Sequence, residues 1–245
     1  MNPRNFFAAV AVLLIAASAS TLKGITVPNF SFEDPTQSPG ANDVGGNGNM
    51  TAITNWTITA PPSSGTNNGV FYPASGLTPE NGNQVAYVFP GATGATCSIT
   101  TTSSLGAIAA NMLYTLTVAL GNGGGNLSTF NTGTYTIELL ANGTPVATNM
   151  LAGSAIPNGT FRDLSTVFSS PASGGVVGDA LTIQLSATSG STNDEGFFDN
   201  VRLTASPIPE PATVLLTGAG TAVLLLRRRL SQLLTRAEGP DRALR

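Results

Sequence analysis

Acidic side chains are the main groups in this sequence that could perform acid–base chemistry. The chain of 245 residues has no histidine and a single cysteine, Cys97, which lies in a strand-like run and is predicted to be buried. Ser-His-Asp triads, Cys-His pairs and His-ligated zinc are therefore excluded. Asp194, Glu195 and Asp199 are the carboxylates that a glycosidase-like site would use. Adjacent residues on an extended chain point to opposite faces, so Asp194 and Glu195 make a poor acid/base pair, and we predict that the protein is not an enzyme.

The middle of the chain, residues 23–207, is strongly acidic. It contains ten acidic and three basic residues and so has a net charge of −7, whereas the whole chain has −3 because most of its arginines lie near the C-terminus. Nucleic-acid binding needs a basic stripe that neutralises phosphates, so we predict no nucleic-acid partner. The negative charge favours binding of a divalent cation.

The same region has the sequence pattern of β-strands. Apolar and polar residues alternate over residues 114–120, 135–139 and 197–203, which is typical of half-buried strands. Asn142 and Gly143 follow one of these runs directly, and both tolerate the positive φ angles of a type I′ hairpin turn. We therefore predict an all-β fold, an antiparallel β-sandwich of the jelly-roll type with about eight to ten strands and under about 10% helix.

Both ends of the chain have the features of addressing segments. Arg4, an apolar stretch over residues 6–17 and the small residues Ala17 and Ala19 predict a signal peptide. Near the other end a proline-rich motif precedes an apolar helix over residues 212–226, which is shorter than the roughly 20 residues of a full membrane span, and then three arginines. The motif and the basic stop are Pro209, Glu210, Pro211, Arg227, Arg228 and Arg229. The predicted organisation is a signal peptide at 1–20, a β-sandwich at 23–207, a hydrophobic sorting segment at 208–229 and a cytoplasmic tail at 230–245.

The C-terminal motif, span and arginines resemble the PEP-CTERM sorting signal of exported bacterial proteins. This resemblance implies processing by an exosortase, a transient anchor in the inner membrane, and then delivery to the cell surface or the extracellular space. It also implies a structural role in an exopolysaccharide or biofilm matrix. An ordinary tail anchor with a single span is the alternative for the C-terminal segment.

Three short segments of the middle region resemble galactose-binding-like jelly-roll modules, a group that includes many carbohydrate-binding modules. They are residues 27–33, 55–58 and 196–203. The resemblance implies a structural Ca²⁺ held by Glu33 and Asp199, because Ca²⁺ takes oxygen ligands; the alternative is that both are turn or edge-strand residues. A carbohydrate-binding module with a specific glycan is the alternative function. Trp56 and Tyr72 would then stack on a sugar, although a jelly roll also needs aromatic rings in its core.

Overall fold

The computed structural model of the protein describes residues 22–39, 52–64 and 68–208. Eleven β-strands and two short 3-10 turns make up its regular structure, and the described residues contain no α-helix. The elements are β1 (Lys23–Ile25), β2 (Trp56–Thr59), η1 (Pro62–Ser64), β3 (Gly69–Phe71), β4 (Val85–Val88), β5 (Thr96–Thr101), β6 (Met112–Asn122), β7 (Thr134–Ala141), β8 (Thr144–Ala152), η2 (Gly153–Ala155), β9 (Thr160–Ser169), β10 (Leu181–Thr188) and β11 (Gly196–Pro207).

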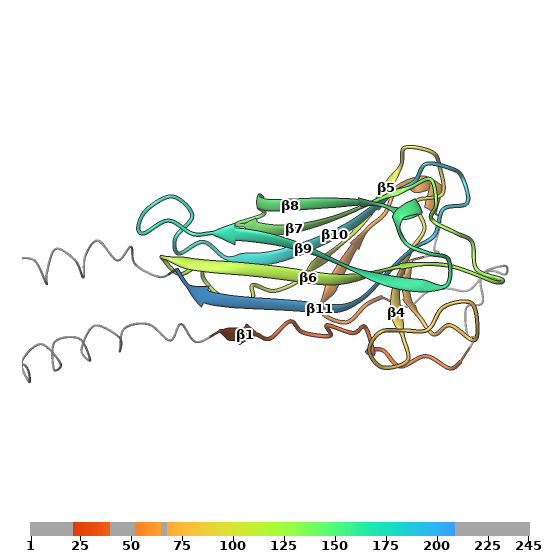
Figure 1. The fold of residues 1–245 in the computed structure, drawn as a ribbon, viewed down its shortest axis with the longest axis horizontal. Helices are drawn as coiled ribbons and strands as arrows, with labels where there is room; N and C mark the ends of the chain where they lie inside the picture. Colours follow the sequence, from red (N-terminus) through yellow and green to blue (C-terminus); the bar gives the residue numbers. More distant parts are fainter. Residues whose placement is uncertain (1–21, 40–51, 65–67, 209–245) are drawn as a thin grey trace, which may run out of the picture. The chain divides into compact units, whose positions relative to one another are not determined.

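The strands form two antiparallel sheets that face each other (Figure 1). The first sheet has the order β3-β4-β11-β6-β9, with β1 also paired to β11, and the second has the order β2-β5-β10-β7-β8. The predicted antiparallel β-sandwich is therefore confirmed. The predicted hairpin turn joins β7 to β8, with φ of 46° at Asn142 and 81° at Gly143.

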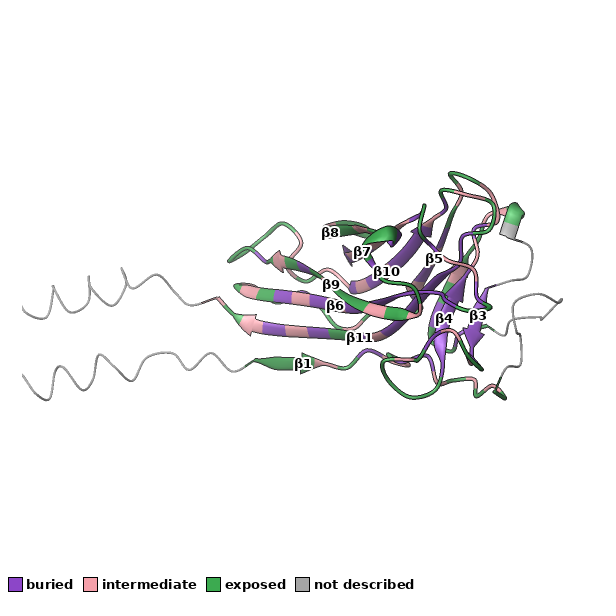
Figure 2. Ribbon diagram, turned by 45° about the vertical axis from the view of Figure 1, so that its right-hand side comes forward, coloured by how far each residue is buried: buried purple, intermediate pink, exposed green. Residues whose placement is uncertain are grey.

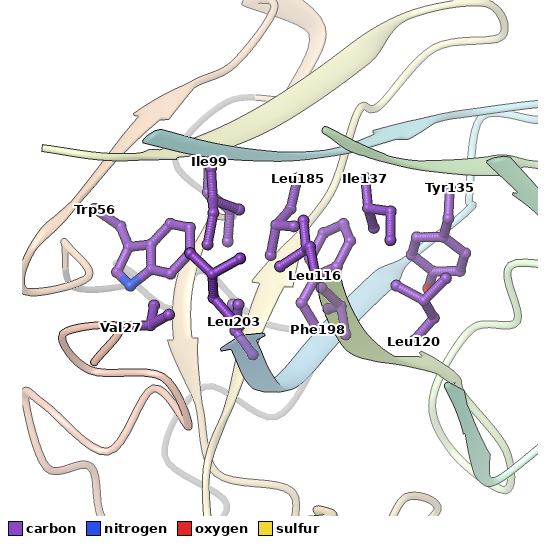
Figure 3. Close-up of a cluster of buried hydrophobic side chains, with 14 of the residues drawn as sticks. Val27, Trp56, Ile99, Leu116, Leu120, Tyr135, Ile137, Leu185, Phe198 and Leu203 are labelled. Carbon is purple, nitrogen blue, oxygen red and sulfur yellow. The ribbon is translucent and has the colours of Figure 1, made fainter. Parts of the chain in front are cut away.

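The apolar residues predicted from the alternation over residues 114–120 and 135–139 meet between the two sheets. Over residues 197–203 a bulge between Asp199 and Arg202 breaks the predicted alternation, so Phe198 rather than Phe197 belongs to the core between the sheets. Figure 3 shows this core, in which Leu116 and Leu203 of the first sheet face Ile99 and Leu185 of the second. Side chains that point into the space between the sheets are removed from water, which is the main favourable contribution to folding. The predicted C-terminal helix, the signal peptide and the sorting motif lie outside the described residues, and within the described ranges no helix is long and apolar enough to span a membrane.

A second buried cluster lies on the opposite face of the first sheet. Strands β3 and β4 are buried on both faces (Figure 2). Ala86 and Val88 of β4 belong to the core between the sheets, whereas Val85 and Tyr87 alternate with them and face outward. The outer cluster consists of Phe71, Leu77, Val85, Tyr87, Leu127 and Phe197, with Phe89 and Phe161 packed against it. Because Leu77 and Leu127 lie in loops, this face of the sheet is covered by the β3–β4 and β6–β7 connections.

Candidate functional site

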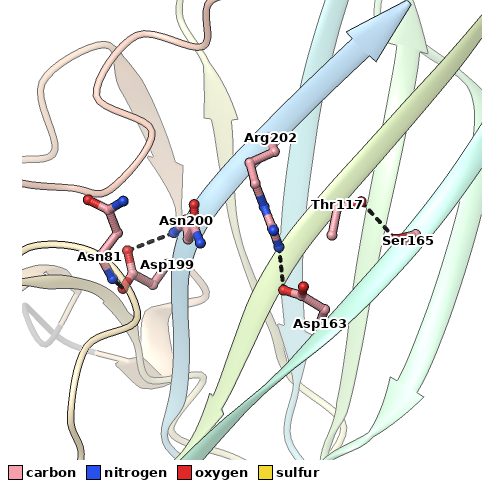
Figure 4. Close-up of polar contacts among 7 residues, drawn as sticks. All are labelled: Asn81, Thr117, Asp163, Ser165, Asp199, Asn200 and Arg202. Atoms are coloured by element: carbon pink, nitrogen blue, oxygen red, sulfur yellow. Dashed lines mark hydrogen bonds and ion pairs between the residues drawn. The ribbon is translucent and has the colours of Figure 1, made fainter. Parts of the chain in front are cut away.

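The two carboxylates predicted as calcium ligands lie on either side of the loop that leads into β4. Glu33 Oε1 accepts hydrogen bonds from the backbone N–H groups of Asn83 and Gln84, at 2.8 and 2.7 Å. Asp199 Oδ2 accepts one from the N–H of Asn81 at 2.8 Å, and Figure 4 shows this contact. The loop is thus held by one carboxylate from each end of the domain.

Asp199 is fully buried and lies close enough to Glu33 for the two charges to interact. Burial raises the pKa of Asp199 to about 7, and the negative charge of Glu33 adds to the increase, although backbone N–H donors oppose it. The two arginines of the described residues have other partners: Arg202 pairs with Asp163, and Arg162 donates to the carbonyl of Ala155. No group of three or more His, Cys, Asp or Glu side chains that could hold a metal occurs in the described part of the chain.

The other residues predicted from the sequence are not brought together. Trp56 is 3% exposed, its ring packs on Phe32 at 5.4 Å, and its Nε1 donates to the carbonyl of Pro28, so the indole is part of the core. Tyr72 is half-buried and follows β3. Cys97 is buried, as predicted. The two aromatic side chains therefore do not form a common platform for a sugar.

Asp194 stabilises a loop. Its carboxylate accepts hydrogen bonds from the hydroxyl groups of Thr132 and Ser191 and from the backbone N–H groups of Gly190 and Ser191. These donors reach both oxygens of the carboxylate. Asp194 thus fixes the turn before β11.

Glu195, next to it, has a different environment that the sequence analysis did not recognise. It is 3% exposed, and its Oε2 accepts a hydrogen bond from the backbone N–H of Ser128 at 3.0 Å. Burial raises the pKa of Glu195 to about 7, while the hydrogen bonds from Ser128 act in the opposite direction. A carboxyl group with this pKa is partly protonated at neutral pH and can give up a proton there.

Tyr87 is the neighbour of Glu195 on β4. Its side chain is 1% exposed, and its hydroxyl group is the one buried side-chain polar atom of the described residues without a hydrogen-bond partner at normal geometry. Burial, followed by the charge of Glu195 and a side-chain hydrogen-bond interaction with it, raises the pKa of Tyr87 above its ordinary range, so the phenol stays protonated. A buried polar group without a partner costs free energy, which a bound molecule that offers a partner would recover.

Aromatic rings surround this pair. The ring centroids of Phe71, Tyr87 and Phe197 lie 5.5 to 6.1 Å apart in tilted arrangements. Tyr87 and Phe197 are register partners on β4 and β11, and Glu195 precedes Phe197 by two positions. The site therefore combines a partly protonated carboxyl group, a buried phenol beside it and an aromatic wall, which together suit proton donation to an electron-rich apolar molecule.

Comparison with known proteins identifies a family of cyclases. The family described as HpiC1-like, HpiC1 cyclase, matches residues 23–204. The Stig cyclase Fisc from Fischerella sp. TAU, solved in complex with (3Z)-3-(1-methyl-2-pyrrolidinylidene)-3H-indole, is 26% identical, with a TM-score of 0.62 over 76% of this chain and 99% of that chain. A cyclase from Fischerella sp. TAU in complex with 4-(1H-indol-3-yl)butan-2-one is 26% identical, with a TM-score of 0.61 over 76% and 98%. An apo form cyclase from Fischerella sp. is 27% identical, with a TM-score of 0.62 over 78% and 98%. No curated protein matches the chain.

These similarities correct several predictions. The prediction that the protein is not an enzyme is wrong, because the matched family and the three structures are cyclases. The predicted matrix role and its alternative, a carbohydrate-binding module, are wrong for the same reason. The exosortase and the exopolysaccharide are replaced as partners by a small molecule, and the assignment to the PEP-CTERM surface proteins is not upheld. The absence of histidine and of a well-placed carboxylate pair excluded certain catalytic arrangements from the sequence, but it did not exclude an enzyme that uses a single carboxyl group.

Proposed function

The chain belongs to the HpiC1-like cyclase family, and on this premise we propose that it closes a ring in an indole-bearing small molecule by proton transfer from Glu195. The observation that carries the proposal is the burial of Glu195 beside the buried Tyr87 hydroxyl group. The indole part of the proposal rests on the ligands of the two Fischerella complexes.

The reaction begins when the Glu195 carboxyl group donates its proton to an unsaturated carbon of the substrate. The resulting cation forms beside Phe71 and Phe197, whose electron-rich faces stabilise positive charge. A carbon–carbon bond then closes as a nucleophilic double bond of the same molecule attacks the cation, and loss of a proton to the Glu195 carboxylate restores the enzyme. The Tyr87 hydroxyl group, which has no hydrogen bond of normal geometry within the described residues, donates a hydrogen bond to a polar group of the substrate and orients it.

Glu195 suits this role better than Asp199 does. The Asp199 carboxylate accepts hydrogen bonds from the backbone N–H groups of Asn81 and Asn200, which hold it in a fixed position and stabilise its anion. Glu195 also lies beside Tyr87, whereas Asp199 faces the loop before β4.

Ligand binding provides a first test of the proposed function. The protein is expected to bind 4-(1H-indol-3-yl)butan-2-one saturably, with a single site in isothermal titration calorimetry. Tyr87→Phe is expected to weaken binding several-fold, since a hydrogen bond contributes about 1 kcal/mol. Absence of any saturable binding to the wild-type protein would be incompatible with an indole-binding cyclase.

We also propose that a structural calcium ion lies between Glu33 and Asp199. The donor set fits the ion, because two neighbouring carboxylates supply the oxygen ligands that Ca²⁺ prefers and the basic side chains of the described residues lie elsewhere. The ion would join the first and last segments of the domain and take no part in proton transfer. The exposed carboxylate of Asp163, paired with Arg202, provides a control position.

Calcium is expected to raise the Tm of the domain by about 5–10 °C at a hundredfold excess over its Kd, because an ion that binds only the folded state stabilises it by about 2.7 kcal/mol. Differential scanning fluorimetry in EDTA and in calcium measures this shift. Glu33→Gln and Asp199→Ala should each abolish it, and Asp163→Asn should preserve it. Equal Tm values of the wild-type domain in EDTA and in calcium would contradict the proposed calcium site.

The sequence-based predictions of jelly-roll connectivity and export form part of the same proposal. The orders β4-β11-β6-β9 and β5-β10-β7-β8 support a jelly roll, since consecutive strands return to the two sheets in the manner of paired Greek keys. The signal peptide at 1–20 supports export, and the boundaries at 23–207, 208–229 and 230–245 remain predictions.

A further inference from the structure

The outer face of the first sheet carries a row of residues that crosses four strands. Tyr87 of β4 is the register partner of Phe197 of β11, which pairs with Gly121 of β6, which in turn pairs with Phe161 of β9. Three of these four positions carry aromatic rings. The row begins beside Glu195, since Glu195 lies two positions from Phe197 on the same face of the chain.

Gly121 leaves room for the ring of Phe161. A Cβ atom at Gly121 would lie 2.7 Å from Cε1 of Phe161, which is closer than such contacts occur in proteins, and at a tight 3.0 Å from Cβ of Phe197. The Phe161 ring therefore lies over the backbone of β6, in the place that a side chain would otherwise occupy, and packs against the outer cluster that contains Phe197. The absence of a side chain at Gly121 thus lets the Phe161 ring of β9 join this cluster.

Phe161 also differs from the other rings in its exposure. Phe71, Tyr87 and Phe197 are at most 1% exposed, whereas Phe161 is half-buried. Phe161 lies two strands away from β11, which corresponds to about 10 Å, a distance that a fused bicyclic ring can largely bridge. A molecule that stacks on Phe161 can therefore direct an attached group toward Glu195.

We propose that Phe161, placed over Gly121, is a specificity-determining residue that selects a bicyclic aromatic ring over a smaller one. This inference rests on the proposed function, because it assigns the ring of the substrate to a particular wall of the same site. The Phe161 face binds the ring, and the Glu195 and Tyr87 pair acts on the attached chain.

The test compares two ketones that differ in their rings, 4-(1H-indol-3-yl)butan-2-one and 4-phenylbutan-2-one, by titration calorimetry of the full-length protein. The wild-type protein is expected to prefer the indolyl ketone. Phe161→Ala is expected to raise the Kd of the indolyl ketone about tenfold, which is the upper value for a stacked aromatic pair, and to change the Kd of the phenyl ketone less. Gly121→Ala, which displaces the Phe161 ring, should have the same effect.

Phe168→Ala is the matched control. Phe168 is also a half-buried phenylalanine of β9, but it stacks on Tyr114 at 6.1 Å and packs against the core between the sheets. The Phe168→Ala substitution is expected to lower the Tm of the protein without changing its preference between the two ketones. If Phe161→Ala destabilises the fold, Phe161→Leu measures the same preference. An unchanged preference in folded Phe161 variants would overturn the inference and leave the proposed function intact, whereas a wild-type protein that binds neither ketone would overturn both.

Discussion

Glu195→Gln is expected to lower the rate constant of cyclisation at neutral pH by about two orders of magnitude or more, because a positioned general acid contributes about 10²–10⁴. Glutamine has nearly the same shape as glutamate, and its carbonyl oxygen can still accept the hydrogen bond from the Ser128 N–H. It cannot release a proton to a carbon atom. Single-turnover measurements with a saturating substrate separate this loss from any change in binding.

The pH dependence of the wild-type rate provides a second readout of the same group. Because the pKa of Glu195 is about 7, the protonated and active form is lost as the pH rises through that value. The rate should therefore fall about tenfold for each pH unit well above 7, and the residual rate of Glu195→Gln should lack this decrease. Asp163→Asn, on the surface, should retain the wild-type profile. Wild-type turnover by Glu195→Gln would exclude Glu195 as the proton donor.

The fold could be predicted from local sequence features. Alternating residues over 114–120 and 135–139 identify half-buried strands by themselves, and the Asn142–Gly143 turn defines the hairpin between β7 and β8. These signals depend on residues that are neighbours in the chain. The two-sheet arrangement follows from them because each sheet has an apolar face that must be buried.

The site could be predicted only in part, because it depends on contacts between distant segments. The sequence identified Glu33 and Asp199 as carboxylates near the two ends of the domain, and the loop before β4 joins them. Tyr87 and Glu195 meet only through the pairing of β4 with β11. Asp194 and Glu195 have separate partners, since Asp194 accepts from the N–H of Gly190 and Glu195 from the N–H of Ser128. The alternation that separates adjacent acids also places Glu195 on the same face as Phe197, which the sequence analysis did not use.

The functional prediction failed at the step from fold to activity. Segments 27–33 and 196–203 indicated a jelly-roll framework, and this type of framework carries many unrelated functions. In the function proposed above, the distinction between a sugar-binding surface and a cyclase site lies in a few side chains on the outer face of the first sheet. Burial of Glu195 by the β6–β7 loop is one of these features, and it depends on the position of Ser128 rather than on any local pattern.

The unfolding free energy of the domain, measured in EDTA, is expected to decrease as the pH rises from about 5 to about 8. The pKa of Glu195 is raised from 4.5 to about 7 in the folded protein, so between these values the folded state holds a proton that the unfolded state releases. This contribution is fully present below 4.5 and is lost as the pH rises through about 7. At about 1.4 kcal/mol per pKa unit, Glu195 accounts for about 3 kcal/mol.

Asp199 acts in the same direction, since its pKa rises from 3.8 to about 7. Urea denaturation at pH 5 and pH 8 measures the summed contribution of Glu195 and Asp199 to the unfolding free energy. The Glu195→Gln variant separates the contribution of Glu195 from that of Asp199. The variant should have nearly the stability of the wild type at pH 5 and exceed it at pH 8, because it removes a carboxylate that must ionise without a cation beside it. The Asp163→Asn variant should have the unfolding free energy of the wild type at both pH 5 and pH 8. A wild-type domain that becomes more stable between pH 5 and pH 8 would show that Glu195 is ionised and well solvated in the folded state, and Glu195 would then be unsuited to donate a proton at neutral pH.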